Sequence, residues 1–291
     1  MEKLKILVRS EIGKLRAVIM QPPGKGIERC TPLNVGSLSW DAVPSPAKAA
    51  EEHRKWVAAV ESYGARVFLF QDLLRDVFAL HGVKEEWLPR ILDAERPFVS
   101  GQTLEVLLEF LSGLSPDVLV ERLFFGMTKD ELSRETGEVS LGDLADKTSE
   151  WCLFPMTNVL YSRDSGAVLG DGMIFGRMLN RDRMKEPPCL RAIFRRHPLL
   201  KDAGWKTWYG AADEDDTPVE GGNVHCYSRN VFVIGVNERT HPSSIEKIAK
   251  RTMESGEITD VLALVFENQR IGPQDSIGLN VHVDMFLNMI D

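Results

Sequence analysis

The last fifteen residues, IGLNVHVDMFLNMID, place a histidine and a carboxylate two positions apart. Apolar and polar residues alternate in this stretch, which is typical of a half-buried β-strand. A strand would turn His282 and Asp284 to the same side. An imidazole beside a carboxylate can act as a general acid and base. The pattern therefore predicts two members of an active site on a strand.

Two further polar clusters follow predicted strands. In MTNVLYSRDS, Asn158 and Asp164 share strand parity and would face one side of a sheet, although the Arg-Asp-Ser triplet is also typical of a strand that runs into a turn. In PVEGGNVHCYS, Glu220 precedes two glycines, which permit a bend or a close approach of two backbones. Each cluster alone is compatible with an ordinary turn, so the interpretation depends on all three together.

The other polar patterns do not predict a metal or phosphate site. PPGKG lacks the spacing and the Ser/Thr of a P-loop. His225 and Cys226 are neighbours on a predicted strand, so they would face opposite sides. His282 and Asp284 have no third ligand at a metal-binding spacing. We therefore expect no metal and no cofactor.

The elements that must position these residues are short strands and helices. A helix is predicted where Ala49, His53, Trp56, Val57 and Val60 recur at helical spacing, with Gly64 at its end. Strands are predicted at 4–9, 17–24, 65–74, 154–164, 167–178, 231–240 and 261–270.

A helical block separates the strand-rich parts, from about 76 to 135. Its signals are a leucine stripe, a Ser-Pro helix start at Ser115 and a capping box formed by Thr128 and Glu131. The stripe consists of Leu104, Leu107, Leu108 and Leu111. The organisation predicted is an α/β domain formed by 1–75 and 136–291, with a helical insertion at 76–135.

The composition is that of an ordinary globular protein, with 43% apolar and 27% charged residues among 291. A net charge of −8 argues against a nucleic-acid or anionic-membrane surface. We see no signal peptide and no apolar run that approaches a membrane span. The four scattered cysteines contain no C-x-x-C pair, which predicts reduced thiols. These features predict a soluble, cytoplasmic α/β protein.

Taken together and in chain order, the motifs resemble the arginine deiminase family of the guanidino-group-modifying superfamily. The resemblance extends over nearly the whole chain. It includes SEIGKLRAVIMQPPGKGIERCTPLN, the Trp40-Asp41 segment, the Glu52-His53 helix, the helical block, MTNVLYSRD, RDRMKE, VEGGNV, GVNERT and HVDMFLNMID. The resemblance implies an α/β propeller of five pseudosymmetric ββαβ blades with an inserted helical bundle, incomplete in this chain, and a site at the axis of the blades.

The family's reaction is hydrolysis of L-arginine to L-citrulline and ammonia through a covalent thiouronium intermediate on a cysteine. The resemblance implies that Asp164 and Asp284 bind the guanidinium, for which carboxylates are the matching acceptors. It makes His282 the general acid and base and Glu220 its acidic partner. The residues that it assigns to the substrate α-carboxylate are Asn158, Arg183 and Arg239.

The sequence departs from the family pattern at the nucleophile. The family's cysteine follows the His-x-Asp motif, but this chain ends seven residues after Asp284 without a further cysteine. Cys226 is in the wrong place relative to Glu220. We therefore expect a C-terminal truncation that leaves a sheet edge and an apolar patch uncovered. Asn223 stands where the family usually has aspartate, which predicts a weaker substrate contact or a shifted preference.

Two alternatives stay open. One is a catalytically inactive protein that binds arginine or another guanidino compound. The other is a related amidinotransferase or guanidine deiminase, although the helical insertion and Arg239 favour an α-amino-acid substrate. The expected partner is a small-molecule substrate, L-arginine, and the chain is a possible homo-oligomer.

Overall fold

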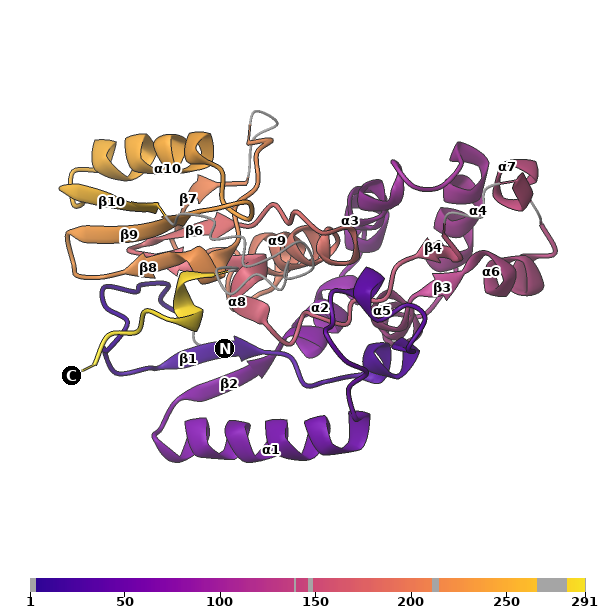
Figure 1. Ribbon diagram of the computed structural model, residues 1–291, viewed down its shortest axis with the longest axis horizontal. Helices are drawn as coiled ribbons and strands as arrows, with labels where there is room; N and C mark the ends of the chain where they lie inside the picture. The colour runs from indigo at the N-terminus through magenta and orange to yellow at the C-terminus, as the bar shows by residue number, and fades with distance from the viewer. Residues whose placement is uncertain (1–3, 139, 146–148, 211–214, 266–281, 291) are drawn as a thin grey trace, which may run out of the picture. The chain divides into compact units, whose positions relative to one another are not determined.

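The computed structural model describes residues 4–138, 140–145, 149–210, 215–265 and 282–290 of a mixed α/β protein with small sheets and helices (Figure 1). The chain forms two compact units. Unit 1 comprises Met1–Leu15, Arg163–Leu179 and Pro198–Asp291. Unit 2 comprises Arg16–Ser162 and Asn180–His197. Segments distant in sequence therefore build each unit.

Unit 1 contains two three-stranded sheets of the same design. In each, the first two strands are antiparallel and the third is parallel to the second. The first sheet has β5 (Gly166–Leu169), β6 (Gly172–Phe175) and β7 (Lys206–Tyr209). The second has β8 (Val224–Cys226), β9 (Val231–Val236) and β10 (Asp260–Val265). Helix α10 (Pro242–Glu254) provides the long connection that the parallel pair β9–β10 requires.

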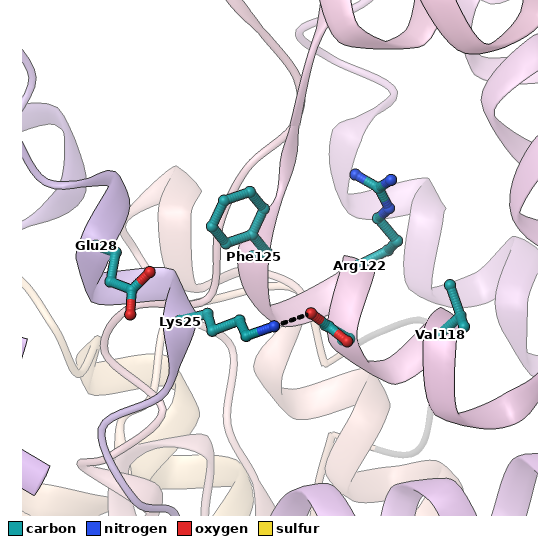
Figure 2. A pocket seen from close by; sticks show the side chains of 6 residues that line it. Lys25, Glu28, Val118, Arg122 and Phe125 are labelled. Atoms are coloured by element: carbon teal, nitrogen blue, oxygen red, sulfur yellow. Dashed lines mark hydrogen bonds and ion pairs between the residues drawn. The ribbon is translucent and has the colours of Figure 1, made fainter.

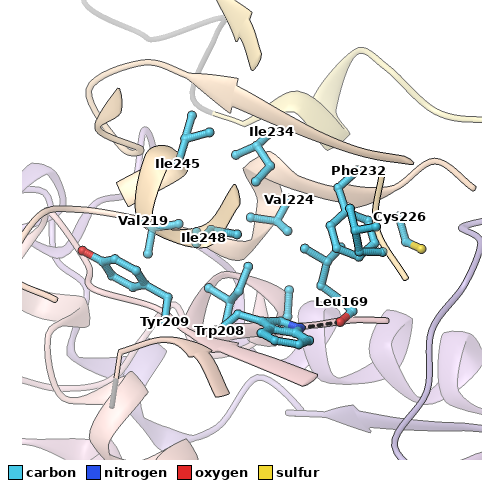
Figure 3. Close-up of a cluster of buried hydrophobic side chains, with 13 residues drawn as sticks. Leu169, Trp208, Tyr209, Val219, Val224, Cys226, Phe232, Ile234, Ile245 and Ile248 are labelled. Carbon is cyan, nitrogen blue, oxygen red and sulfur yellow. Dashed lines mark hydrogen bonds between the residues drawn. The ribbon is translucent and has the colours of Figure 1, made fainter. Parts of the chain in front are cut away.

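The core of unit 1 lies between these sheets and α10 (Figure 3). Ile245 and Ile248 of α10 are buried with Phe232 and Ile234 of β9. The indole N–H of Trp208 donates to the carbonyl of Leu169 at 2.7 Å, so the largest side chain of the cluster has its polar atom satisfied. Val219 and Val224 belong to the same cluster, so this core packs against the segment that carries Glu220.

Unit 2 begins with a parallel strand pair. The strands β1 (Ala17–Met20) and β2 (Arg66–Leu69) are joined through α1 (Pro46–Ser62). Gly64 follows α1 with φ of 82°, a conformation in which glycine has no steric penalty. Short 3-10 helices, η1 (Lys25–Arg29) and η2 (Gly36–Leu38), precede α1.

The rest of unit 2 is mostly helical. Its helices are α2 (Phe70–Phe78), α3 (Val83–Leu92), η3 (Asp93–Glu95), α4 (Gly101–Ser112), α5 (Pro116–Phe125), α6 (Lys129–Thr136), α7 (Leu141–Ala145), η4 (Arg181–Arg183) and α9 (Glu186–Arg196). The antiparallel pair β3 (Met127–Thr128) and β4 (Trp151–Leu153) lies beside α6. Leu104, Leu107 and Leu111 of the predicted stripe are buried, and Leu108 is half-buried.

Many predicted elements are confirmed. Strands occur within 17–24, 167–178, 231–240 and 261–270, and 76–135 is predominantly helical. The predicted helix is α1, although Trp56 of its stripe is 57% exposed. Residues 266–270 lie outside the described part of the chain. The domain division at 1–75, 76–135 and 136–291 stays a prediction.

Three predicted strands are wrong over part or all of their length. The strand at 65–74 ends at Leu69, because Phe70, Leu73, Leu74 and Val77 have helical spacing and are buried together in α2. Residues 4–9 form only one bridge, between Val8 and Gly170. No strand occurs at 154–164, where Ser162–Ser165 form the short helix α8. The shared strand parity of Asn158 and Asp164 is therefore wrong.

The C-terminal strand is also not found in the described residues 282–290. His282 is extended, with φ of −139° and ψ of 150°, and Val283–Met285 form a single 3-10 turn, η6. Residues 277–281 and 291 of the predicted strand lie outside the described part of the chain. A turn thus positions Asp284, and extended backbone directly before it carries His282.

None of the helices in the described part of the chain has the length and apolar character needed to cross a membrane.

The capping box of α6 should stabilise unit 2 measurably. Thr128 accepts a hydrogen bond from the Glu131 N–H at 3.1 Å, and the Glu131 carboxylate accepts one from the Thr128 N–H at 2.8 Å. We expect Thr128→Ala to lower the free energy of unfolding by about 0.5–2 kcal/mol in urea denaturation. Ser115→Ala is the control, because Ser115 begins α5 without a side-chain cap. Equal losses in both variants would contradict this role of the box.

Candidate active site

His282 lies between two buried carboxylates of unit 1. Its Nε2 is 2.7 Å from Oε2 of Glu220, and its Nδ1 is 3.5 Å from Oδ1 of Asp164. Glu220 is fully buried, and His282 and Asp164 are 7% and 5% exposed. The predicted acid–base pair and one predicted guanidinium ligand are thus brought together. With Asp284, which follows in η6, these residues form the carboxylate–histidine cluster.

Hydrogen bonds outside the cluster fix both the carboxylate and the backbone of Glu220. Its Oε1 accepts from the Leu179 N–H at 3.1 Å and from the guanidinium of Arg239 at 3.4 Å. Its backbone N–H donates to Thr240 Oγ1 at 3.3 Å. A buried carboxylate with such partners keeps a fixed orientation, so its second oxygen faces His282.

The two glycines after Glu220 allow the cluster to assemble. A Cβ on Gly222 would lie 2.7 Å from Cγ of His282 and 2.8 Å from Oδ1 of Asp164. A Cβ on Gly221 would collide with the carbonyl oxygen of Arg163. The close backbone approach predicted from Glu-Gly-Gly is therefore confirmed, and it brings this segment against both Asp164 and His282.

Arg163 and Glu11 position the same segment, and the sequence argument missed this role. The Arg163 guanidinium makes two contacts with the Glu11 carboxylate, at 2.9 and 3.1 Å. It also donates to the carbonyls of Gly221 and Val224 at 3.2 and 2.7 Å. The signal was the arginine directly before Asp164, but its partner is 152 residues away, which spacing cannot reveal.

The charges of the cluster shift two pKa values. Burial lowers the pKa of His282, but its hydrogen bond to Glu220 and the negative charges around it outweigh burial, so its pKa lies above the ordinary 6.5. Burial and the negative charge of Asp164 raise the pKa of Asp284, against the opposing charges of His282 and Arg163. Asp164 and Asp284 thus lie close enough to repel each other, and a bound cation would relieve that repulsion.

The other predicted site residues have protein partners. In unit 1, Arg239 pairs with Glu220, as described above. In unit 2, Arg183 makes a two-point ion pair with Glu186, with both contacts at 2.9 Å. The amide of Asn158 donates to Asp182 at 3.0 Å and to the Leu38 carbonyl at 2.8 Å. Their roles toward a substrate carboxylate stay predictions.

The cysteines are all buried. Burial raises the pKa of Cys30 and of Cys226 to about 11 and that of Cys189 to about 12. Cys226 is the cysteine of unit 1, and its thiol contacts the carbonyls of Val8 and Ser228 at 3.3 and 3.4 Å. A protonated thiol engaged in this way is a poor nucleophile at neutral pH.

A separate pocket occurs in unit 2 and contains none of the predicted site residues (Figure 2). Its lining is Lys25, Glu28, Val118, Glu121, Arg122 and Phe125. An ion pair between Lys25 and Glu121, at 2.5 Å, lies in this pocket. The side chains are those of a charged surface, and no predicted chemistry depends on them.

Comparison with known proteins shows the family of the chain. A family model described as arginine deiminase matches residues 36–291. The chain belongs to the arginine deiminase family. Arginine deiminase 1 of Staphylococcus epidermidis is 31% identical over 290 residues, which cover 98% of this chain and 67% of that protein.

Two further members of the arginine deiminase family show the same extent of similarity. The arginine deiminase of Limosilactobacillus reuteri is 31% identical over 283 residues, covering 97% of this chain and 68% of that protein. That of Rhodococcus erythropolis is 30% identical over 286 residues, covering 98% and 67%. The chain thus spans about two thirds of the length of these relatives.

A methyl group at position 222 should disturb the cluster. We expect Gly222→Ala to lower the free energy of unfolding by about 1–3 kcal/mol, because the new Cβ has no room beside His282 and Asp164. Gly13→Ala is the control in the same unit, since its Cβ would meet nothing closer than 3.7 Å. Urea denaturation of both variants tests this. If Gly222→Ala were as stable as Gly13→Ala, the close approach would be wrong.

The pKa of His282 should depend on Glu220. A histidine whose folded pKa is raised adds stability below its unfolded pKa, near 6.5, and loses it as pH rises through the folded value. We expect Glu220→Gln to lower the pKa of His282, followed by NMR of the imidazole, and to flatten this loss of stability above pH 6.5. Glu254→Gln, at an exposed position, should change neither. An unchanged titration in Glu220→Gln would contradict the pairing.

Proposed function

We propose that the carboxylate–histidine cluster binds the guanidinium of L-arginine, and that the activity it supports is that of an arginine deiminase. The observation that carries the proposal is His282 between Asp164 and Glu220, with Asp284 close by, in a chain of this family. Two carboxylates that repel each other form a favourable site for a cation, and guanidinium N–H groups pair well with carboxylate oxygens.

The reaction would replace one guanidinium nitrogen with oxygen. A thiolate forms a bond to the central carbon, the C–N bond breaks, and His282 gives a proton to the departing ammonia. Water then attacks the same carbon, His282 takes its proton, and the thiolate leaves as L-citrulline forms. Glu220 favours the protonated imidazole in the first step, because it hydrogen bonds to Nε2 at 2.7 Å.

The thiolate in this scheme is not among the four cysteines of this chain. All four are buried, and the thiol of Cys226 is directed to two backbone carbonyls. The chain therefore supplies the guanidinium ligands and the acid–base group. We therefore expect the 291-residue chain by itself to bind arginine without turnover.

The propeller architecture is part of the proposal. Its support is a repeat of strand, strand, helix and strand in chain order. The repeat occurs first as β5, β6, α9 and β7. It occurs again as β8, β9, α10 and β10. Both sheets have the same strand order and directions. We propose that they are two blades of a five-bladed α/β propeller. Buried cysteines without a C-x-x-C pattern support a cytoplasmic location.

Calorimetric titration with L-arginine, together with a citrulline assay on the same sample, tests the function. We expect binding without citrulline. Binding should weaken by up to about tenfold per pH unit as acid protonates Asp284, because the raised pKa of this ligand places its protonation above pH 3.8. Absence of binding at neutral pH would overturn the proposal, and citrulline formation would contradict the exclusion of the four cysteines.

Replacement of the Asp164 carboxylate should show whether this side chain binds the guanidinium of L-arginine. We expect Asp164→Asn to weaken L-arginine binding by at least about a hundredfold, since a charge-assisted pair is lost from a buried site. Asp260→Asn is the matched control, because Asp260 is exposed on β10 of the same unit. Equal affinity of the two variants would show that Asp164 does not contact the guanidinium.

A further inference from the structure

Asn223 connects three segments of unit 1 from a fully buried position at the end of η5 (Gly221–Asn223). Its Oδ1 accepts a hydrogen bond from the Val283 N–H at 3.0 Å. Its Nδ2 donates to Oδ1 of Asn237 at 3.0 Å and to Oγ1 of Thr240 at 2.9 Å. One amide thus joins the segment after Glu220, the turn 237–240 and the peptide between His282 and Val283.

The surrounding bonds determine the orientation of this amide. Oδ1 of Asn237 also accepts from the backbone N–H groups of Arg239 and Thr240, at 2.9 and 3.1 Å. An atom that accepts from two backbone N–H groups must be the oxygen, so the nitrogen of Asn223 has to face it. The oxygen of Asn223 is then directed to Val283.

Val283 and its acceptor are tightly packed. Val283 is fully buried, and a Cβ on Gly235 of β9 would lie 2.8 Å from Oδ1 of Asn223 and collide with the Val283 side chain. Loss of the Asn223 side chain would therefore leave the Val283 N–H buried without its acceptor, or let the peptide turn. Either change moves the residues on both sides, His282 and Asp284.

We propose that Asn223 is a positioning residue that fixes His282 and Asp284 for guanidinium binding. This inference rests on the proposed function of the cluster. An aspartate at this position could still accept from Val283 N–H. It would, however, turn an oxygen toward Oδ1 of Asn237 and add a buried negative charge beside Glu220, Asp164 and Asp284.

Two substitutions separate these contributions. Asn223→Ala removes both halves of the amide, and Asn223→Asp keeps the acceptor and adds charge. Asn230→Ala is the matched control, because it removes an asparagine of the same unit whose amide donates to the exposed Glu257 carbonyl instead of to the cluster. The readouts are the NMR titration of His282, calorimetric titration with L-arginine and urea denaturation.

We expect Asn223→Ala to weaken L-arginine binding by roughly tenfold or more and to change the His282 titration, whereas Asn230→Ala changes neither. Asn223→Asp should raise the pKa of His282 above its value in the parent chain. If Asn223→Ala lowered stability alone, with arginine affinity and the His282 titration unchanged, the residue would be merely structural and the inference would be overturned.

The His282 titration distinguishes a failure of this inference from a failure of the proposed function. If the parent chain does not bind L-arginine, the proposed function fails, and the His282 titration in the variants still decides the role of Asn223. If Asn223→Ala does not fold, Thr240→Val tests the same network, because it removes one acceptor of the amide. A His282 titration unchanged in both Thr240→Val and Asn223→Asp would then overturn the inference.

Discussion

The hydrogen bond between Nε2 of His282 and the Glu220 carboxylate is the interaction on which the site depends. Both groups are buried, so either one without the other would leave an unsatisfied polar or charged group away from water. The carboxylate in turn is fixed by the Leu179 N–H and by Arg239. Unit 1 therefore has a built-in orientation for the imidazole before any substrate is present.

The second constraint is the close packing of backbones around this bond. Gly222 brings one segment against His282 and Asp164, and Gly235 gives room to Val283. These approaches are possible only at glycine, which explains why the acid–base residues can come from segments 62 positions apart. The amide of Asn223 lies within the same packing, and its hydrogen bond to the Val283 N–H links the segment after Glu220 to the residues around His282.

The chemistry was more predictable from the sequence than the backbone that carries it. His282, Asp164 and Glu220 were recognisable by residue type and motif, and the closeness of Glu-Gly-Gly to other backbone followed from glycine itself. Strands were expected to carry His282 and Asp164. In the described residues a 3-10 turn directly follows His282, and Asp164 lies in a short helix. Alternation over a few residues does not distinguish a strand from a turn packed on one side.

Hydrogen-bond partners that are distant in the sequence could not be predicted, for a different reason. Arg163 and Glu11, and likewise Asn223 and Val283, are joined by hydrogen bonds that no local pattern encodes. Helix starts are predictable where the local signal is strong, as at the Ser-Pro start of α5 and the capping box of α6. The strand predicted at 65–74 gives way to a helix at Phe70, because burial of the apolar face of α2 outweighs continuation of the strand.

A crystal structure of the 291-residue chain with L-arginine would test the central claim most directly. We predict the guanidinium between the carboxylates of Asp164 and Asp284, its central carbon unmodified, with His282 still hydrogen bonded to Glu220. A guanidinium bound elsewhere, for example at the acidic side chains of the pocket in unit 2, would contradict the account. So would a His282 that has left Glu220 in the complex.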